Sequence, residues 1–230
     1  MAARATRWSA STSMGCAVLD ALPPTIGKIL YVSSTGVYGQ IDGEEIDESS
    51  PTEPRREGGR VCLAAERALQ AHPLGRNGVI LRLAGIYGPG RVPNRADLVA
   101  GKPLPFDPAG HLNLIHVDDA AEAILAAERG ATTPNLFVVS DGSPAARGDY
   151  YAELRGCGTP PRRASHRRRT TRRLRRRRLR RAVTVLMRRC RGGADKRISP
   201  AKLIRDLDMR FRFADFRAGL ADIARRDVSS

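Results

Sequence analysis

Three short apolar runs along the chain predict buried strands. They are Ile29–Val32, Gly78–Ala84 and Asn135–Ser140 (ILYV, GVILRLA and NLFVVS). Each run is continuous rather than alternating and is rich in β-branched or aromatic residues, which is typical of a strand covered on both faces. A shorter run, Leu112–Val117, predicts a further strand. We therefore expect a parallel sheet.

Helical spacing of apolar residues appears between these runs. Arg60–His72 and Asp118–Arg129 both repeat apolar positions every three to four residues, and Met14–Leu22 has the character of a helix end that is broken by two prolines. The acidic, proline-containing stretch from Gln40 to Gly59 has no periodicity and is predicted to be a surface loop. Strands that alternate with helices indicate the α/β class.

The start of the helix predicted after Leu112–Val117 carries two acidic residues. Asp118 and Asp119 are expected to complement the helix dipole and to cap free N–H groups. We expect His116, which precedes them, to have a structural role rather than a catalytic one.

Candidate chemistry begins where the first strand ends. Ser33, Ser34 and Thr35 follow Ile29–Val32 directly. Ligands of open α/β sheets bind just beyond the carboxyl ends of parallel strands, so these hydroxyls are expected to face the crevice rather than the core. Serines at strand ends also cap turns, which is the purely structural alternative.

The motifs YVSSTGVYG and LRLAGIYGPGR resemble the extended short-chain dehydrogenase/reductase family, specifically the NAD-dependent epimerases and dehydratases that act on sugar nucleotides. The resemblance implies a partial Rossmann-like, doubly wound parallel sheet with a small C-terminal α+β lobe. It also implies that Ser34, four residues before Tyr38, is the catalytic hydroxyl.

The same resemblance implies a cofactor, NAD or NADP, and a nucleotide-sugar-like small molecule as the substrate. The residues implied to border the cofactor are Ser33, Tyr87 and Gly88. The residues implied to meet the substrate are Thr35, Arg91 and Arg95.

Two features of the family pattern are missing. The Tyr-x-x-x-Lys dyad of the family, whose phenol transfers a proton, falls on Gly58 and Cys62, and Arg60 is a poor replacement because guanidinium groups do not deprotonate. The Gly-x-x-Gly-x-x-Gly phosphate loop and the acidic residue that holds the ribose do not occur either. We expect a truncated family member that binds its cofactor weakly or not at all and is catalytically impaired.

The net charge of +16 comes from one segment. Of the 40 Lys and Arg residues, 16 are arginines between Arg162 and Arg191, where no acidic residue occurs; the other 24 balance the 24 Asp and Glu residues. This block is predicted to be disordered or irregular. It could be a nucleic-acid arm, a disordered tether or the product of a frame slip in a GC-rich gene, and we favour the frame slip. The alternative function is nonspecific polyanion binding.

The family resemblance divides the chain into three parts. Residues 1–155 are expected to form the C-terminal part of a Rossmann-like domain with substrate-lobe elements. Residues 156–194 are expected to form an irregular Arg-rich segment, and residues 195–230 further substrate-lobe elements.

The sequence contains no run of eighteen apolar residues, so no membrane span is predicted. The four cysteines are scattered, without Cys-x-x-Cys spacing, so neither a metal site nor a disulfide framework is expected. A cytoplasmic location is expected.

Overall fold

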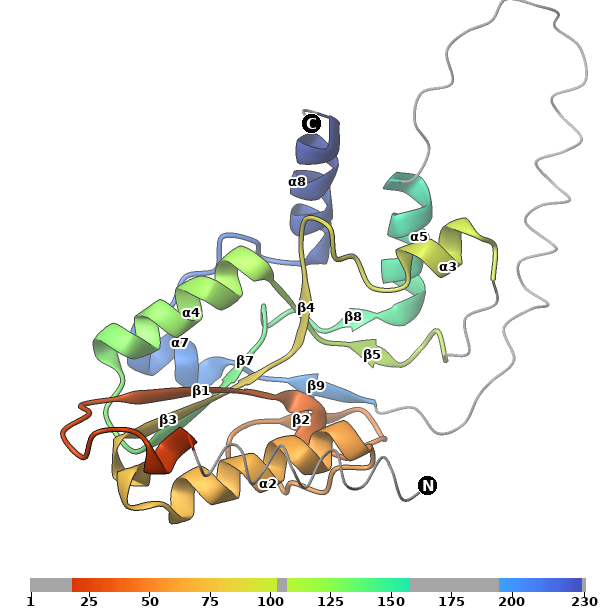
Figure 1. Cartoon of the computed structure of the whole chain (residues 1–230). Helices are drawn as coiled ribbons and strands as arrows, with labels where there is room; N and C mark the ends of the chain where they lie inside the picture. Colours follow the sequence, from red (N-terminus) through yellow and green to blue (C-terminus); the bar gives the residue numbers. More distant parts are fainter. Residues whose placement is uncertain (1–17, 103–106, 158–194, 229–230) are drawn as a thin grey trace, which may run out of the picture.

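A three-stranded parallel sheet lies at the centre of the computed structural model, which describes residues 18–102, 107–157 and 195–228. The strand order is β1-β3-β7, with the bounds Ile29–Ser34, Gly78–Leu83 and Asn135–Val139 (Figure 1). In the register, Ile29 lies opposite Gly78 and Val79 lies opposite Asn135. The parallel sheet predicted from the three apolar runs is confirmed.

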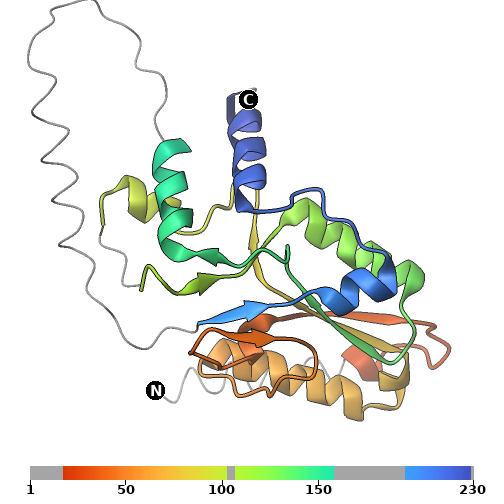
Figure 2. The ribbon, with the colours of Figure 1, turned by 180° about the vertical axis from the view of Figure 1, so that it is seen from behind.

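Helices cover both faces of this sheet. Helix α2 (Glu57–Ala71) lies on one face, while α4 (Val117–Gly130) and α7 (Ala201–Leu207) lie on the other (Figures 1 and 2). The main core forms on the α4 and α7 side, because alternate residues of β3 and β7 point there. The buried residues that β3 and β7 contribute to this core are Val79, Leu81, Leu83, Phe137 and Val139.

A second group of elements forms a smaller lobe beyond the sheet (Figure 2). Its strands form two pairs, one parallel and one antiparallel: β4 (Gly85–Tyr87) with β6 (Leu114–His116), and β5 (His111–Leu112) with β8 (Ala145–Ala146). Its helices are α3 (Arg95–Val99), α5 (Arg147–Cys157) and α8 (Phe216–Val228). An aromatic cluster of Tyr87, Tyr150, Tyr151 and Phe216 packs at the centre of this lobe. These elements provide the α+β part that the sequence predicts.

The predicted loop from Gln40 to Gly59 is wrong in two places. It contains β2 (Glu44–Ile46), which pairs in parallel with β9 (Lys196–Ile198), and its last residues already belong to α2. Ile46 and Ile198 lie opposite each other, and both are buried. A three-residue strand is too short to show periodicity, and its partner is distant in the sequence.

The run from Leu112 to Val117 is not one strand. It divides at Asn113 into β5 and β6, which pair with different partners. The side chain of Asn113 explains the break, because its Nδ2 donates to the Lys196 carbonyl (2.8 Å) and its Oδ1 accepts from the Ile198 N–H (2.8 Å).

The acidic start of α4 makes a tertiary contact as well as a local one. Asp119 is buried, and its two carboxylate oxygens accept from the backbone N–H groups of Arg212 (2.8 Å) and Phe213 (3.0 Å). His116 is the N-cap of α4, and its Nδ1 accepts from the Asp118 N–H at 3.2 Å. Asp119 therefore fixes the chain segment that leads into α8.

Two predictions fall largely or entirely outside the described residues. The first is the Arg-rich segment predicted over residues 156–194, of which only residues 156 and 157 are described. Of the predicted helix end at Met14–Leu22, only residues 18–20 are described as helical. None of the helices in the described ranges has the length and apolar character needed to span a bilayer.

Candidate functional site

The carboxyl end of β1 carries the predicted catalytic hydroxyl. Ser34 is the last residue of β1 and the N-cap of the 3-10 turn η1 (Thr35–Val37). It is partly exposed, and its Oγ accepts from the Gly36 N–H at 3.0 Å. This bond uses a lone pair of the hydroxyl oxygen and leaves its proton free to be donated to a ligand.

The two neighbours of Ser34 point into the protein. Ser33 is buried, and its Oγ donates to Glu66 Oε1 at 2.5 Å, so the expectation that this hydroxyl faces a crevice is wrong. The reason is the alternation of side chains along a strand, which places successive residues on opposite faces. Thr35 is also buried. A cofactor role for Ser33 and a substrate role for Thr35 stay predictions.

A buried ion pair lies directly beneath this turn. Arg82 of β3 donates to Glu66 of α2 through Nε (3.1 Å) and Nη2 (2.6 Å), and both side chains are less than a tenth exposed. Arg82 Nη1 also donates to the Tyr38 hydroxyl at 2.7 Å, and that hydroxyl donates to the Asp47 carbonyl at 2.8 Å. Burial raises the pKa of Tyr38, which keeps the phenol protonated for this role. The network joins β1, β3 and α2 at the base of the Ser34 turn.

The two dyad positions lie on α2 and hold residues that do not replace the dyad. Gly58 is exposed, and a Cβ built there would meet no other atom within 4 Å. Cys62 is partly buried, and burial raises the pKa of its thiol, with a smaller contribution from the Glu66 carboxylate. Arg60 is exposed and donates to the Arg55 carbonyl. A thiol with a raised pKa is a weak nucleophile and a weak base at neutral pH.

Lys196 is a residue of this region that sequence analysis misses. It comes from β9, is 8% exposed, and donates from Nζ to the carbonyls of Thr35 (2.7 Å) and Tyr38 (2.6 Å). Burial lowers the pKa of Lys196 to about 8, and the charge of Arg56 adds to this effect. The pairing of β2 with β9 brings this lysine to the Ser34 turn, and no local pattern in the sequence shows that pairing.

The second predicted group lies at the end of β4. Tyr87 is buried, its ring stacks edge-on against His116 at 5.2 Å, and its hydroxyl approaches the Asp215 carbonyl at 3.4 Å. Gly88 is close to α4, because a Cβ there would lie 2.5 Å from Val117 Cγ1. The backbones of Gly88 and Arg91 exchange two hydrogen bonds of 2.9 Å, which form a tight turn.

The two arginines predicted to meet the substrate follow this turn. Arg91 is exposed, and Arg95 is exposed at the first position of α3. The structure therefore gathers Ser33, Ser34 and Thr35 at the carboxyl end of β1. It places Tyr87, Gly88 and Arg91 at the end of β4, which belongs to a different sheet, and Arg95 in α3. The residues of each group lie together because they are adjacent or nearly adjacent in the sequence.

A buried acid at the end of β7 is the second residue that sequence analysis misses. Asp141 is 7% exposed, its Oδ1 accepts from the Ser143 N–H at 2.9 Å, and its Oδ2 has no hydrogen-bond partner among the described residues. Burial raises the pKa of Asp141 to about 7, and the nearby carboxylates of Asp215 and Asp119 add to this rise. A titratable group with such a shift at the end of a parallel strand is a candidate functional residue.

Other buried polar atoms of the lobe also have no hydrogen-bond partner among the described residues, including His116 Nε2 and the Tyr150 hydroxyl. Burial lowers the pKa of His116, which favours its neutral form. We find no group of three or more His, Cys, Asp or Glu side chains placed to hold a metal ion in the described ranges.

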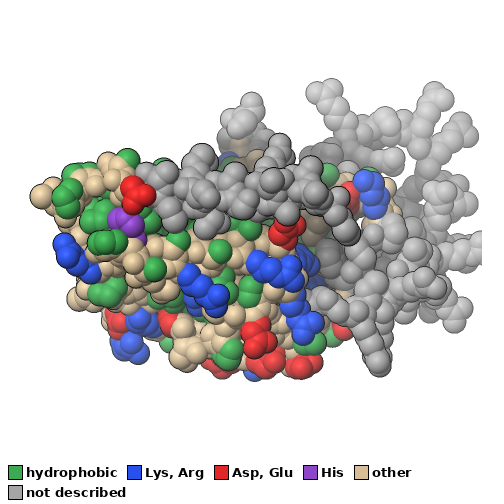
Figure 3. All heavy atoms as spheres, turned by 60° about the horizontal axis from the view of Figure 1, so that its bottom comes forward, with side chains coloured by type: hydrophobic (Ala, Val, Ile, Leu, Met, Phe, Trp, Pro, Cys, Tyr) green, Lys and Arg blue, Asp and Glu red, His purple; other side chains and the backbone are tan. Residues whose placement is uncertain are grey.

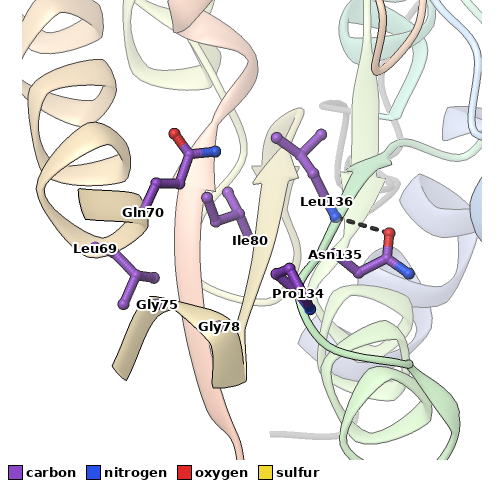
Figure 4. Close-up of a pocket in the computed structure, with 8 residues that line it drawn as sticks. All are labelled: Leu69, Gln70, Gly75, Gly78, Ile80, Pro134, Asn135 and Leu136. Atoms are coloured by element: carbon purple, nitrogen blue, oxygen red, sulfur yellow. Dashed lines mark hydrogen bonds between the residues drawn. The ribbon is translucent and has the colours of Figure 1, made fainter. Parts of the chain in front are cut away.

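A pocket lies at the opposite end of the sheet from Ser34. Its volume is about 300 Å³, and it opens at the amino ends of β3 and β7 beside the C-terminal turn of α2 (Figure 4). Its lining residues are Leu69, Gln70, Gly75, Gly78, Ile80, Pro134, Asn135 and Leu136. None of the predicted site residues lines this pocket.

A parallel sheet that is covered on both faces, with polar side chains at the carboxyl ends of its strands, defines a Rossmann-like α/β protein. The family model described as "NAD dependent epimerase/dehydratase family" matches residues 2–139. The chain belongs to this family.

Among curated relatives, Protein YeeZ of Escherichia coli K12 is 36% identical over 135 residues, which cover 59% of this chain and 47% of that protein. The matched region therefore spans about half of its length.

Solved structures show the same fold. A protein of unknown function from Silicibacter pomeroyi has a TM-score of 0.63 at 25% identity, and the match covers 87% of this chain and 66% of that one. The dTDP-glucose 4,6-dehydratase of Bacillus anthracis, solved in complex with NAD, has a TM-score of 0.70 at 16% identity. The match covers 95% of this chain and 67% of that one. DesIV of Streptomyces venezuelae, a dTDP-glucose 4,6-dehydratase solved with NAD and TYD, also has a TM-score of 0.70, at 20% identity. The match covers 95% of this chain and 64% of that one.

The raised pKa of Asp141 predicts a loss of stability with rising pH. Its value in the folded protein, about 7, lies above the ordinary value of 3.8, so the folded state holds the proton more tightly than the unfolded state. The contribution of the protonated Asp141 to the free energy of unfolding is fully present below about pH 4 and is lost as the pH rises through 7. Asp141→Asn should remove this dependence and raise the free energy of unfolding above pH 7 by on the order of 3 kcal/mol.

Urea unfolding followed by circular dichroism between pH 4 and pH 8.5 measures the effect. Asp42→Asn, at an exposed carboxylate, is the control and should keep the pH dependence of the wild type. Parallel pH profiles for the wild type and Asp141→Asn would show that Asp141 is already ionised in the folded protein.

Proposed function

We propose that the chain binds a nucleotide-sugar-like small molecule at the carboxyl end of β1, where Ser34 donates a hydrogen bond to a hydroxyl or keto group of the ligand. The observation that carries this proposal is the geometry of Ser34, whose oxygen accepts from Gly36 and whose proton stays available at the end of a parallel strand. The family of the chain, together with neighbours solved with NAD, supports it.

We also propose that this chain is catalytically impaired. Proton transfer in the family uses Tyr-x-x-x-Lys, and the corresponding positions hold Gly58 and Cys62. Neither can supply a proton-transfer group near neutral pH, because glycine has no side chain and burial raises the pKa of Cys62. Ser34 can still orient a ligand by hydrogen bonding without completing a reaction.

We propose that the cofactor is NAD or NADP and that the chain binds it weakly. The 230 residues contain neither the Gly-x-x-Gly-x-x-Gly loop that cradles the pyrophosphate nor the acidic residue that follows it in a dinucleotide site. Tyr87 and Gly88, with Ser33, are the residues proposed to border the nicotinamide. The buried positions of Ser33 and Tyr87 limit them to contacts made through backbone or ring edges.

Replacing Ser34 by alanine tests the binding proposal. We expect Ser34→Ala to weaken binding of UDP-glucose by about tenfold, which corresponds to the loss of one hydrogen bond to the ligand. Isothermal titration calorimetry or chemical-shift titration measures it. Ser143→Ala is the matched control, because Ser143 also lies in a turn after a parallel strand, and its Oγ donates to the Ala214 carbonyl. The wild type failing to bind would refute the function, whereas equal affinities would refute only the role of Ser34.

Fluorescence titration with NADH and NADPH tests the cofactor proposal. We expect no saturation below roughly millimolar cofactor, because the missing phosphate loop would supply most of the contacts to the pyrophosphate. A known family member with an intact loop serves as the positive control under the same conditions. Micromolar affinity for either cofactor would contradict the proposal.

Polyanion binding is the second candidate function, and one sequence observation favours it. The segment Arg162–Arg191 contains 16 arginines and no acidic residue. In contrast, basic and acidic side chains are interspersed on the α2 face of the protein (Figure 3). We propose that this segment binds RNA or DNA by charge alone, since it has no aromatic residue that could stack on bases.

Deleting Arg162–Arg191 should abolish binding of a fluorescent oligonucleotide and leave any binding of UDP-glucose intact. For the full chain, affinity should fall steeply as the salt concentration rises, because each neutralised phosphate releases a counterion. Filter binding or fluorescence anisotropy at several salt concentrations measures both effects. An undiminished affinity after the deletion would refute this role for the segment.

A further inference from the structure

The side chain of Lys196 joins both ends of the turn that carries Ser34. Its Nζ donates to the Thr35 carbonyl at 2.7 Å and to the Tyr38 carbonyl at 2.6 Å. The Thr35 carbonyl also accepts from the Tyr38 N–H at 3.2 Å, the bond that closes η1. The ammonium group thus stabilises the closed form of this turn, and Ser34 is the residue from which the turn begins.

Lys196 is itself held firmly in place by its neighbours. In β9 it lies opposite Glu44 of β2, and its carbonyl accepts from Asn113 Nδ2 at 2.8 Å. The preceding residue, Asp195, accepts from the Gly43 N–H through its carbonyl, and its Oδ1 accepts from the His111 N–H at 2.7 Å. Because the backbone at Lys196 is fixed from two sides, the ammonium group has a defined position.

The electrostatics of Lys196 favour a specific role over a chance contact. Its side chain is buried, and the two groups that receive its hydrogen bonds are neutral carbonyls. Burying a cation without a carboxylate partner is unfavourable, as the lowered pKa of Lys196 shows. Charge-assisted bonds to two carbonyls offset this cost only where both carbonyls are held at hydrogen-bonding distance. The cation and the turn therefore fix each other.

We propose that Lys196 is a positioning residue for Ser34: by holding the carbonyls of Thr35 and Tyr38, it keeps the turn closed and the Ser34 hydroxyl aimed outward from the end of β1. The ligand part of this inference rests on the proposed function. Its structural part does not, because the closed turn can be measured without any ligand.

The chain provides a matched control in Lys202. This lysine also lies in the C-terminal segment, and its Nζ also makes two hydrogen bonds, to Asn135 Oδ1 (2.6 Å) and the Leu136 carbonyl (2.9 Å). It differs in place, because Asn135 and Leu136 begin β7 at the amino end of the sheet, away from Ser34. Lys202→Met removes a comparable anchor without touching the turn.

Amide hydrogen exchange, measured by NMR on the full-length protein, tests the inference. In Lys196→Met we expect the exchange rates of the Gly36 and Tyr38 amides to rise by about tenfold or more, because the turn opens locally when its two carbonyl contacts are lost. The amides of Leu81 and Leu83 in β3 are the internal reference and should not change. Lys196→Arg, which retains the charge and the donors, should give an intermediate rise.

Three results would overturn the inference. They are unchanged Gly36 and Tyr38 exchange in Lys196→Met, an equal rise in Lys202→Met, and an equal rise in β3, which would indicate a general loss of stability. If Lys196→Met does not fold, the same comparison is made with Lys196→Arg, for which no rise at the two turn amides would contradict the inference.

A ligand measurement separates this inference from the proposed function. If the wild type binds UDP-glucose, Lys196→Met should weaken binding about as much as Ser34→Ala, and Lys202→Met should not. If the wild type does not bind UDP-glucose, the proposed function fails, while the exchange rates at Gly36 and Tyr38 still decide the role of Lys196.

Discussion

The buried ion pair between Glu66 and Arg82 is the interaction on which the Ser34 region depends. It joins α2 to β3 in the interior, and both carboxylate oxygens of Glu66 accept from the guanidinium group. Leaving either charge unpaired in such a place costs about 3–5 kcal/mol, so the two side chains hold α2 against the sheet in one orientation. Ser33 and Tyr38 complete the hydrogen bonds of the pair. The pair therefore specifies how β1 ends as well as how α2 packs.

This constraint explains why Ser34 points outward. Successive residues of a strand face opposite sides, so fixing Ser33 on Glu66 leaves Ser34 to the other side. The same constraint sets the face of α2, because Gly58, Cys62 and Glu66 are spaced four residues apart and lie on one side of the helix. The α2 positions that the family resemblance assigns to the proton-transfer dyad hold an exposed glycine, Gly58, and a partly buried thiol, Cys62.

The strands of the central sheet could be predicted because each is a continuous apolar run, and the helices because their apolar positions repeat regularly. The position of Ser34 followed from the end of such a run. The contacts that surround it could not be predicted in this way. Arg82 stands inside the run Gly78–Ala84 as an isolated charge, and only the packing of α2 shows that Glu66 neutralises it. Lys196 and Asp141 gain their properties from burial among residues distant in sequence, which no local pattern records.

The segment after the Arg-rich block bears on the origin of that block. Residues 195–228 lie beyond the family match to residues 2–139, yet they pair and pack with the earlier part of the chain. Ile198 and Leu203 are buried, and Phe213 and Phe216 are buried in the lobe. A sequence with this many well-placed apolar residues is encoded to fold with the first part. The Arg-rich block therefore interrupts two parts that fold together, and a frame slip followed by a return to the original frame stays our hypothesis for its origin.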